Sequence, residues 1–181
     1  MKSALKKGFT LVELLVVVAI LGILAAILIL AINPAEAQRK SRDATRLSDL
    51  ATIRQAIDLS VANGAVLAGT VAVPVSGDST GSRDTTAVGN WVNMDVSQYL
   101  SVLPIDPRQN ATDVTRLSDG TTTIVAGSMV YSFVSDGDAY ELNAFLESTD
   151  NAPFVNNDGG NQNLRFEIGT SPGLVLSTTT P

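Results

Sequence analysis

The sequence predicts an α+β fold in which a long N-terminal α-helix, membrane-spanning in its first half, packs its second half on a small antiparallel β-sheet. Three observations lead to this prediction. Residues 9–32 are almost all apolar. The next segment, to residue 64, repeats apolar side chains every three or four residues, which is the spacing of one helix face. Beyond it, short segments alternate apolar and polar residues, as strands with one solvated face do.

The composition excludes several classes of chemistry. The chain of 181 residues contains neither cysteine nor histidine, so it has no thiol nucleophile and lacks the commonest general base and zinc ligand. It carries 18 acidic and 12 basic side chains, and most of the acidic ones lie beyond residue 42. An acidic head argues against a nucleic-acid partner. The turn carboxylates Asp106, Asp136 and Asp138 have no second group type to support catalysis, so we expect no enzyme.

The apolar segment over 9–32 is long enough to span a membrane. As a helix, its roughly 24 residues measure about 36 Å, against about 30 Å for a hydrocarbon core. The apolar part of an ordinary secretory signal peptide is shorter, so a removed signal peptide is the weaker interpretation. Basic residues lie before the segment, at Lys2, Lys6 and Lys7, and after it, within 39–46. Loop charge therefore leaves the membrane topology open.

Two residues within this segment need an explanation of their own. Glu13 is its only ionisable side chain. A carboxylate at mid-membrane costs on the order of 3 kcal/mol, so Glu13 either pairs with another group or snorkels to the headgroups. In the membrane, its own chain offers no obvious partner. Gly22 is either a position of close packing between membrane helices or a weak point at which the helix opens.

The first residues form a specific pattern. A short basic leader, Met1-Lys-Ser-Ala-Leu-Lys-Lys-Gly8, is followed by Phe9, and Glu13 is the fifth residue after the leader. This pattern resembles the class III signal of type IV prepilins and of type II secretion pseudopilins. The resemblance implies cleavage after Gly8 by a prepilin peptidase, N-methylation of Phe9 and a role for Glu13 in assembly. It also implies that the leader stays inside and that the rest of the chain beyond the helix is exported.

The resemblance further implies a location and a set of partners. The subunit is expected to cross the cytoplasmic membrane once, with its C-terminus outside, and to leave the lipid for an extracellular or periplasmic filament. Its expected partners are copies of itself, other pilin-like subunits, the prepilin peptidase/methyltransferase and an inner-membrane assembly platform. The alternatives are a major pseudopilin of a type II secretion system and a monomeric membrane-anchored extracytoplasmic binding protein. A plain anchor needs neither Gly8-Phe9 nor Glu13, which argues against the last.

The chain is expected to divide into five segments. These are a cleaved leader over 1–8, a membrane and filament-core helix over 9–34, an amphipathic helix over 35–64, a β-rich head over 65–176 and a disordered tail over 177–181. Pro34 removes a backbone donor and clashes with the preceding turn, so a kink or short break is expected there. Asn63-Gly64 is expected to end the amphipathic helix.

The amphipathic helix has an apolar stripe and a basic stretch. Its stripe consists of Leu47, Leu50, Ile53, Ile57 and Val61. The width of this stripe suits packing on one sheet. The basic side chains within 39–46 are expected to form a solvated face that pairs with Asp43 and Asp49, in preference to binding DNA or acidic lipid.

The head is expected to begin with partial order and to end in strands. A strand within 66–75 is followed by a polar loop over 76–86 and by a short helix or turn over 95–103, which carries Tyr99 and Leu100 into the core. Strands then follow over 128–134, at the alternating Tyr140, Leu142, Ala144 and Leu146, and at Leu164, Phe166 and Ile168, with a turn at Asp136-Gly137. The sheet should have one wet face. Residues 99–107, Tyr131-Ser-Phe and Tyr140-Glu-Leu are also similar to segments of major pseudopilins.

A polar loop before the last strand contains a candidate metal site. Its oxygen-bearing side chains are Asp150, Asn156, Asn157 and Asp158. Oxygen ligands in a flexible loop suit Ca²⁺, and major pseudopilins hold calcium in their C-terminal loops. The spacing is not that of an EF-hand, and loops of this composition are usually turns. Calcium and an ordinary turn therefore both stay open, and no other cofactor is predicted.

Overall fold

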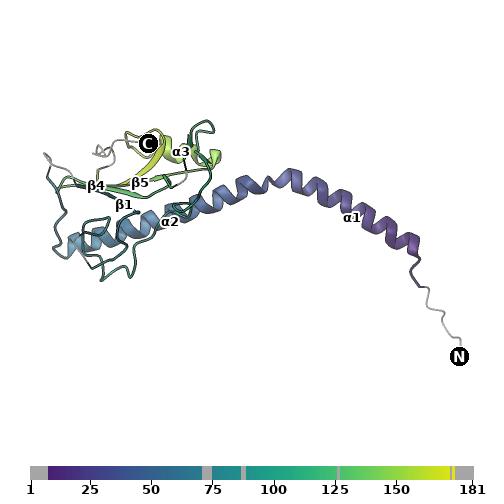
Figure 1. Ribbon diagram of the computed structural model, residues 1–181, viewed down its shortest axis with the longest axis horizontal. Coiled ribbons are helices and arrows are strands. Elements are labelled where there is room, and N and C mark those ends of the chain that lie inside the picture. The colour runs from purple at the N-terminus through teal and green to yellow at the C-terminus, as the bar shows by residue number, and fades with distance from the viewer. Residues whose placement is uncertain (1–7, 71–74, 87–88, 126, 172, 174–181) are drawn as a thin grey trace, which may run out of the picture. The chain divides into compact units, whose positions relative to one another are not determined.

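The computed structural model describes most of the chain. The described residues are 8–70, 75–86, 89–125, 127–171 and 173, with the side chains of 29–32 left aside. The chain divides into two compact units, Met1–Gln38 and Arg39–Pro181. The predicted order of a long apolar helix, a second helix and an antiparallel sheet is confirmed (Figure 1). The expected tail over 177–181 lies outside the described residues.

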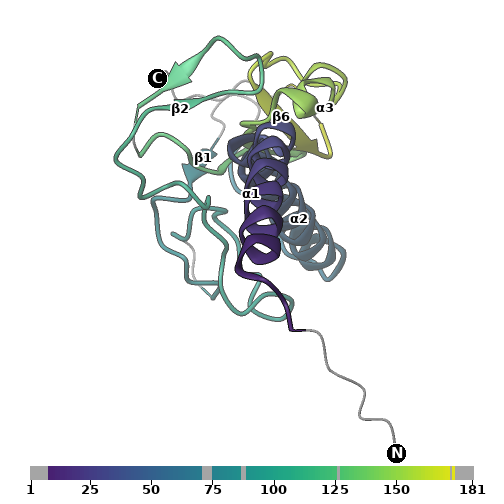
Figure 2. The same ribbon diagram turned by 90° about the vertical axis from the view of Figure 1, so that its right-hand side faces the viewer.

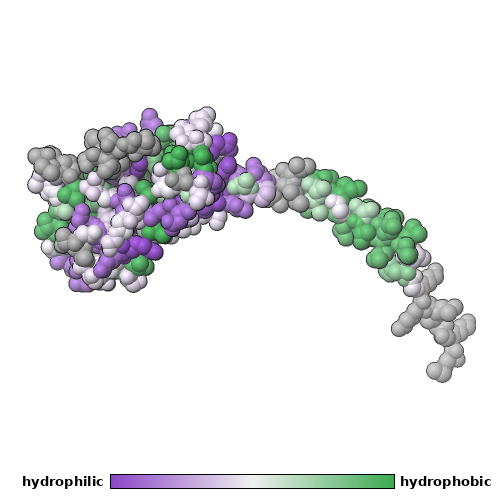
Figure 3. All heavy atoms as spheres, in the orientation of Figure 1, coloured by the Kyte–Doolittle hydropathy of each residue, from purple (hydrophilic) through white to green (hydrophobic). Residues whose placement is uncertain are grey.

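Helix α1 (Leu11–Ile32) presents a mostly hydrophobic surface over 11–28 in the view of Figure 3. Every large apolar side chain from Leu11 to Leu28 is exposed. Among the described residues, one helical stretch, Leu11–Leu28, is long and apolar enough to cross a membrane. An apolar surface of this size marks a site of contact with lipid or with another protein.

The helical run is interrupted at Asn33. This residue adopts the left-handed conformation (φ 44°, ψ 77°) and ends α1, and helix α2 (Pro34–Ala62) begins at the next residue. The main-chain oxygen of Asn33 accepts a hydrogen bond from the Glu36 N–H at 3.1 Å. Proline is tolerated at a first helical position because its missing N–H is not needed there. The predicted break at Asn33-Pro34 is confirmed.

Helix α2 buries one face beyond residue 39. Its buried apolar side chains are Leu50, Ile53, Ala56 and Ile57. The expected stripe is thus correct in its middle, whereas Leu47 is half-buried and Val61 is exposed. Ser60 takes the inward position near the end of the helix and donates to the Asp95 carbonyl oxygen (3.1 Å). After Ala62, Gly64 adopts φ 93°, so Asn63-Gly64 ends the helix as predicted.

The main sheet has four strands in the order β1-β4-β5-β6, and all neighbours are antiparallel. Their bounds are β1 (Val75–Asp78), β4 (Ser132–Ser135), β5 (Tyr140–Phe145) and β6 (Arg165–Gly169). The first strand begins at Val75 and runs into the stretch expected to be a polar loop; residues 71–74 of the expected strand lie outside the described part. Gly137 (φ 91°) forms the predicted turn between β4 and β5.

Smaller elements complete the head. A short hairpin of β2 (Thr115–Arg116) and β3 (Thr123–Ile124) was not predicted from the sequence. Its strands are too short to show an alternating pattern. A 3₁₀ turn, η1 (Thr149–Asn151), leads directly into α3 (Ala152–Asn156) before the last strand.

The core lies between α2 and one face of the sheet (Figure 2). The sheet side of it consists of Tyr131, Phe133, Tyr140, Leu142 and Ala144. The loop over 89–103 adds Trp91, Val92, Met94, Val96 and Leu103. Tyr99 and Leu100 pack against this core from a turn, as predicted. The hydroxyl of Tyr131 also donates to Asp49 on α2 (2.8 Å), which joins the polar edge of the helix to the sheet.

The second face of the sheet is not solvated, contrary to the prediction. Glu141 and Asn143 point away from the core side chains of β5, yet both are 0% exposed. The cross-strand partner of Asn143 is Glu167, which is 2% exposed. The loop before β6 covers this face, since the Gln162 N–H donates a hydrogen bond to Glu167 Oε2 (3.0 Å). Burial, with the nearby charges of Glu141 and Asp158, raises the pKa of Glu167 to about 7.

A buried ion network ties α2 to the rest of the head. The Arg46 guanidinium is 0% exposed and contacts Asp43 (2.8 Å), Asp106 (2.7 Å) and Glu147 (2.8 Å). Burial by itself lowers the pKa of Arg46, but Asp106 and Glu147 outweigh this effect and hold the pKa above its usual range. Arg42 forms a second ion pair with Glu147.

The expectation of a solvated basic face is therefore wrong for Arg46. Its carboxylate partners Asp106 and Glu147 come from segments far along the chain. The charge pattern of the helix alone therefore does not predict these two ion pairs. The Asp43 carboxylate also accepts hydrogen bonds from the N–H groups of Glu147 (2.9 Å) and Ser148 (2.9 Å). The network thus fixes the chain just after β5 to α2.

We expect Arg46→Met to destabilise the head strongly. The substitution leaves buried carboxylates without their cation, which costs about 3–5 kcal/mol in the free energy of unfolding. Chemical unfolding followed by fluorescence of Trp91, the single tryptophan, measures the effect. Arg54→Gln is the matched control, because the Arg54–Asp58 pair is exposed and should contribute less than about 1 kcal/mol. Equal losses in the two variants would contradict this account of the network.

A chain that begins near Ala35 should be a soluble, folded monomer. The buried face of α2 is covered by the sheet of the same chain, and α1 is absent from such a protein. Size-exclusion chromatography and circular dichroism, together with Trp91 fluorescence, test this expectation. An aggregated or unfolded product would show that α2 depends on more than the head for its packing.

Candidate assembly site at the N-terminus of α1

Glu13 closes the first turn of α1 through a capping box with Thr10. One carboxylate oxygen, Oε2, accepts hydrogen bonds from the Thr10 N–H (2.9 Å) and from the Thr10 hydroxyl (2.8 Å). The Thr10 Oγ1 accepts in turn from the Glu13 N–H (3.2 Å). Two N–H groups at the helix start, which have no partner within the helix, are satisfied in this way.

This arrangement corrects the expectation that Glu13 has no partner in its own chain. Thr10 is that partner. The Thr-x-x-Glu spacing in the sequence is the pattern that predicts a capping box. A negative charge at this position also interacts favourably with the positive end of the helix dipole. In the part of the chain that the structure describes, the second carboxylate oxygen of Glu13 accepts no hydrogen bond. Glu13 is thus placed and oriented with one oxygen still available.

The residues expected at the cleavage point lie just before this cap. Residues 8–10 have no regular secondary structure, and α1 begins at Leu11. The Phe9 side chain is 84% exposed. A Cβ at Gly8 would meet no atom within 4 Å, so the backbone there is open. The leader over 1–7 lies outside the described residues. Cleavage at Gly8 and methylation of Phe9 stay predictions, on a segment that is accessible.

The two residues expected to make the helix flexible differ in their local structure. Gly22 lies inside α1 and the helix continues through it, with no atom within 4 Å of a Cβ built there. Pro34 stands at the start of α2, directly after the left-handed Asn33. In this structure, the interruption is therefore at Asn33-Pro34 and not at Gly22.

The four residues of the predicted calcium loop are mostly engaged elsewhere. Asp150 pairs with Lys40, and the Asn157 amide donates to the Pro153 carbonyl oxygen (2.8 Å). The Asp158 carboxylate accepts from the N–H groups of Gly160 (2.9 Å) and Glu167 (2.8 Å). Asn156 is the last residue of α3. In the described ranges, no three Asp or Glu side chains converge as metal ligands. Calcium at these four residues stays a prediction.

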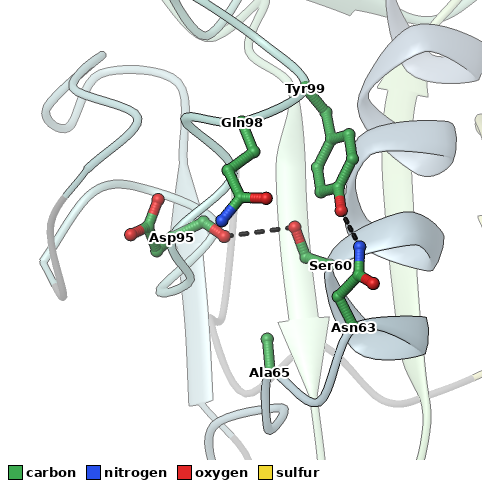
Figure 4. Close-up of a pocket in the computed structure, with 6 residues that line it drawn as sticks. All are labelled: Ser60, Asn63, Ala65, Asp95, Gln98 and Tyr99. Atoms are coloured by element: carbon green, nitrogen blue, oxygen red, sulfur yellow. Dashed lines mark hydrogen bonds between the residues drawn. The ribbon is translucent and has the colours of Figure 1, made fainter.

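A small pocket lies beside the C-terminal end of α2 (Figure 4). It encloses about 150 Å³ and is lined by Ser60, Asn63, Ala65, Asp95, Gln98 and Tyr99. Two of its polar groups bond each other, since the Asn63 amide donates to the Tyr99 hydroxyl. Ligand sites usually measure roughly 300–1,000 Å³. The pocket is therefore a weaker candidate for function than the N-terminal segment.

The comparison with family models points to the same N-terminal segment. Residues 4–29 match the family model of the prokaryotic N-terminal methylation motif. The chain is 51% identical over 59 residues to the type IV major fimbrial protein FimA of Dichelobacter nodosus. That match covers 33% of this chain and 36% of the fimbrial protein. No solved structure is significantly similar to the chain. The methylation motif over 4–29 and the similarity to a major fimbrial protein together support a type IV pilin or pseudopilin family.

Proposed function

We propose that this chain is the precursor of a structural subunit that polymerises through α1 into a type IV pilus-like filament. The observation that carries the proposal is the methylation motif over 4–29, with Gly8, Phe9 and Glu13 at the start of an apolar helix. The helix has no covered apolar face within the described chain from Leu11 to Leu28. A subunit of this kind works by assembly and not by catalysis.

The exposed surface of α1 supports assembly because it must be covered. Burying one Leu, Ile or Val side chain is worth about 1.5–3 kcal/mol, so a stretch of such residues exposed to water costs tens of kcal/mol. Lipid supplies the cover before assembly, and neighbouring helices supply it in the filament. The same apolar surface therefore serves both environments, and leaving the lipid costs little if the helices pack well.

Glu13 supplies the register of assembly in this proposal. Cleavage after Gly8 creates a positive amine at Phe9. In a filament of axially staggered helices, the amine of an incoming subunit meets the free carboxylate oxygen of Glu13 in a subunit already in place. Opposite charges attract strongly in a low-dielectric core, although desolvation offsets much of the gain. Any other stagger buries an unpaired charge, so the pairing selects one axial position.

The membrane topology follows from the same proposal. The leader with its lysines stays in the cytoplasm, α1 crosses the cytoplasmic membrane once, and the acidic head lies outside. The partners are further copies of the chain, other pilin-like subunits, a prepilin peptidase/methyltransferase and an inner-membrane assembly platform. The matched relative is a major fimbrial protein, which supports a pilus-like filament, and the pseudopilin of a type II secretion system stays the alternative. A monomeric anchored binding protein would need neither the methylation motif nor Glu13, which argues against it.

Processing gives the first test of this proposal. Intact mass spectrometry of protein purified from cells with an active prepilin peptidase should give a chain that starts at Phe9 and carries one added methyl group. Gly8→Val should block the cut, because the peptidase reads the small residue before Phe9. A wild-type chain that still starts at Met1, or that is cut within α1 after Ala25 or Ala26, would rule out the pilin interpretation.

Glu13 gives the second test. Glu13→Ala should leave membrane insertion and cleavage intact and should reduce filament yield at least tenfold, as measured by sheared-filament preparations and electron microscopy. Glu13→Gln keeps an oxygen that accepts from Thr10 but removes the charge, and it should fail in the same way. Thr10→Ala removes the hydroxyl of the cap but keeps the charge, so it should assemble.

The three variants separate the two roles of the carboxylate. Filaments from Glu13→Gln but not from Thr10→Ala would mean that Glu13 acts only as a helix cap. Normal filaments from Glu13→Ala would mean that the carboxylate only snorkels to the headgroups, and the proposed register would be wrong.

A further inference from the structure

Three exposed apolar side chains lie on the head at the end where α2 enters it. Phe154 on α3 is 51% exposed, whereas the other aromatic side chains of the head are buried or half-buried. Val114 and Val125 are exposed as well. They stand directly before Thr115 and directly after Ile124, which are cross-strand partners, so the two valines flank the base of the hairpin of β2 and β3. We call Phe154, Val114 and Val125 the apolar rim.

Side-chain contacts fix α3 to the first turns of α2 within the head. Asp150, in the 3₁₀ turn that leads into α3, pairs with Lys40. The Asn151 amide donates to the Asp43 carboxylate (2.8 Å). Phe154 follows Asn151 by three residues, which is less than one helical turn. Figure 1 shows α3 at this same end of the head.

The hairpin base lies close to the same turns of α2. Asp113, directly before Val114, forms an ion pair with Arg108. This contact lowers the pKa of the Asp113 carboxyl, and the charge of Arg42 on α2 adds to the effect. Arg42 is therefore near the base of the hairpin. Figure 2 looks onto this end of the head, with β2 and α3 both in view.

The cations around the apolar rim have carboxylate partners within the head. The ion pairs are Lys40–Asp150, Arg42–Glu147 and Arg108–Asp113. A surface on which the charges are balanced in this way attracts an anionic partner only weakly. Exposed Phe and Val side chains instead favour the boundary between lipid headgroups and acyl chains, where apolar side chains of surface-bound proteins insert. The chemistry of this end of the head therefore fits an uncharged lipid surface.

The length of chain between the apolar segment and the head brings a membrane within reach. The apolar run of the sequence ends at Ile32, and the second compact unit begins at Arg39. Seven helical residues span about 10 Å. The headgroup layer on each side of the hydrocarbon core is about 5–7 Å thick. If α1 is anchored in the membrane, as the proposed function requires, the residues that contact the first turns of α2 in the head lie next to the headgroups.

We propose that the apolar rim of Phe154, Val114 and Val125 docks the head onto the lipid surface before assembly. The partner is the headgroup layer of the leaflet from which α1 emerges, and the contact is apolar and shallow. The inference rests on the proposed function, because it needs α1 in the membrane. Docking would hold the unassembled subunit in one orientation, and the contact would be broken when the subunit enters a filament.

Fluorescence quenching on the full-length chain in phosphatidylcholine vesicles tests this contact. The chain has no cysteine, so a single introduced cysteine carries the fluorophore NBD without background. Asn156→Cys places the label two residues from Phe154. Asp138→Cys places it at the other end of the head, since Gly137 lies against Gly69, beyond the C-terminal end of α2. A nitroxide on the lipid headgroup should quench the label at 156 and leave the label at 138 nearly unchanged.

Two matched variants separate the apolar rim from apolar exposure in general. Phe154→Ser should reduce quenching of the label at 156 to the level seen at 138. Val66→Ser is the control, because Val66 is 82% exposed but follows the C-terminal end of α2, and quenching should stay as in the wild type. Added NaCl should not change the quenching, because the contact does not depend on charge. If Phe154→Ser does not fold, as judged by Trp91 fluorescence, Val125→Ser gives the same comparison.

Flotation of the same vesicles separates failure of the docking from failure of the proposed function. A chain that does not float with the vesicles would contradict both. A chain that floats, but shows no quenching at 156, would overturn the docking alone. Equal loss of quenching in Phe154→Ser and Val66→Ser, or loss with added NaCl, would also overturn it. Protection of the label at 156 from aqueous iodide that grows with the protein density, without quenching by lipid, would mean that a second copy covers the apolar rim instead.

Discussion

The exposed apolar surface of α1 is the constraint on which the rest of this protein depends. From Leu11 to Leu28 the large side chains of α1 are all exposed. A surface of this kind suits lipid or contact with further helices. The other unit has its own core, ion network and covered sheet face, all within residues 39–173.

Polar interactions define the head as much as its apolar core does. Arg46 connects α2 to Asp106 and Glu147, and the Tyr131 hydroxyl connects the sheet to Asp49. Ion pairs of this kind add little net stability compared with apolar packing, but they penalise every arrangement that leaves one member unpaired. The chain has few aromatic residues to fix the packing of α2 on the sheet. Such pairing favours one position of α2 over positions in which the helix is shifted along the sheet.

The sequence predicted the features that are encoded locally. Asn33-Pro34, Gly64 and the turn at Gly137 are breaks that single residues impose on the backbone, and they lie where expected. The pairing of Arg46 with Asp43 was expected, but its burial was not, because its other partners, Asp106 and Glu147, come from distant parts of the chain. The polar alternation at Glu141 predicted a wet face, since no periodicity reveals that a later loop will cover it. The capping box of Thr10 and Glu13 is the opposite case, because the sequence pattern that predicts it is local.

The position of the capping box has a consequence for how the leader can evolve. Both hydrogen-bonding residues, Thr10 and Glu13, lie beyond Gly8, and the Thr10 N–H belongs to the peptide that follows Phe9. Cleavage after Gly8, as proposed, would therefore leave every hydrogen bond of the capping box in place. The residues that begin the helix and the residues before the proposed cleavage point occupy separate stretches of sequence. Under this proposal, changes before Gly8 alter recognition of the leader without altering the capping box.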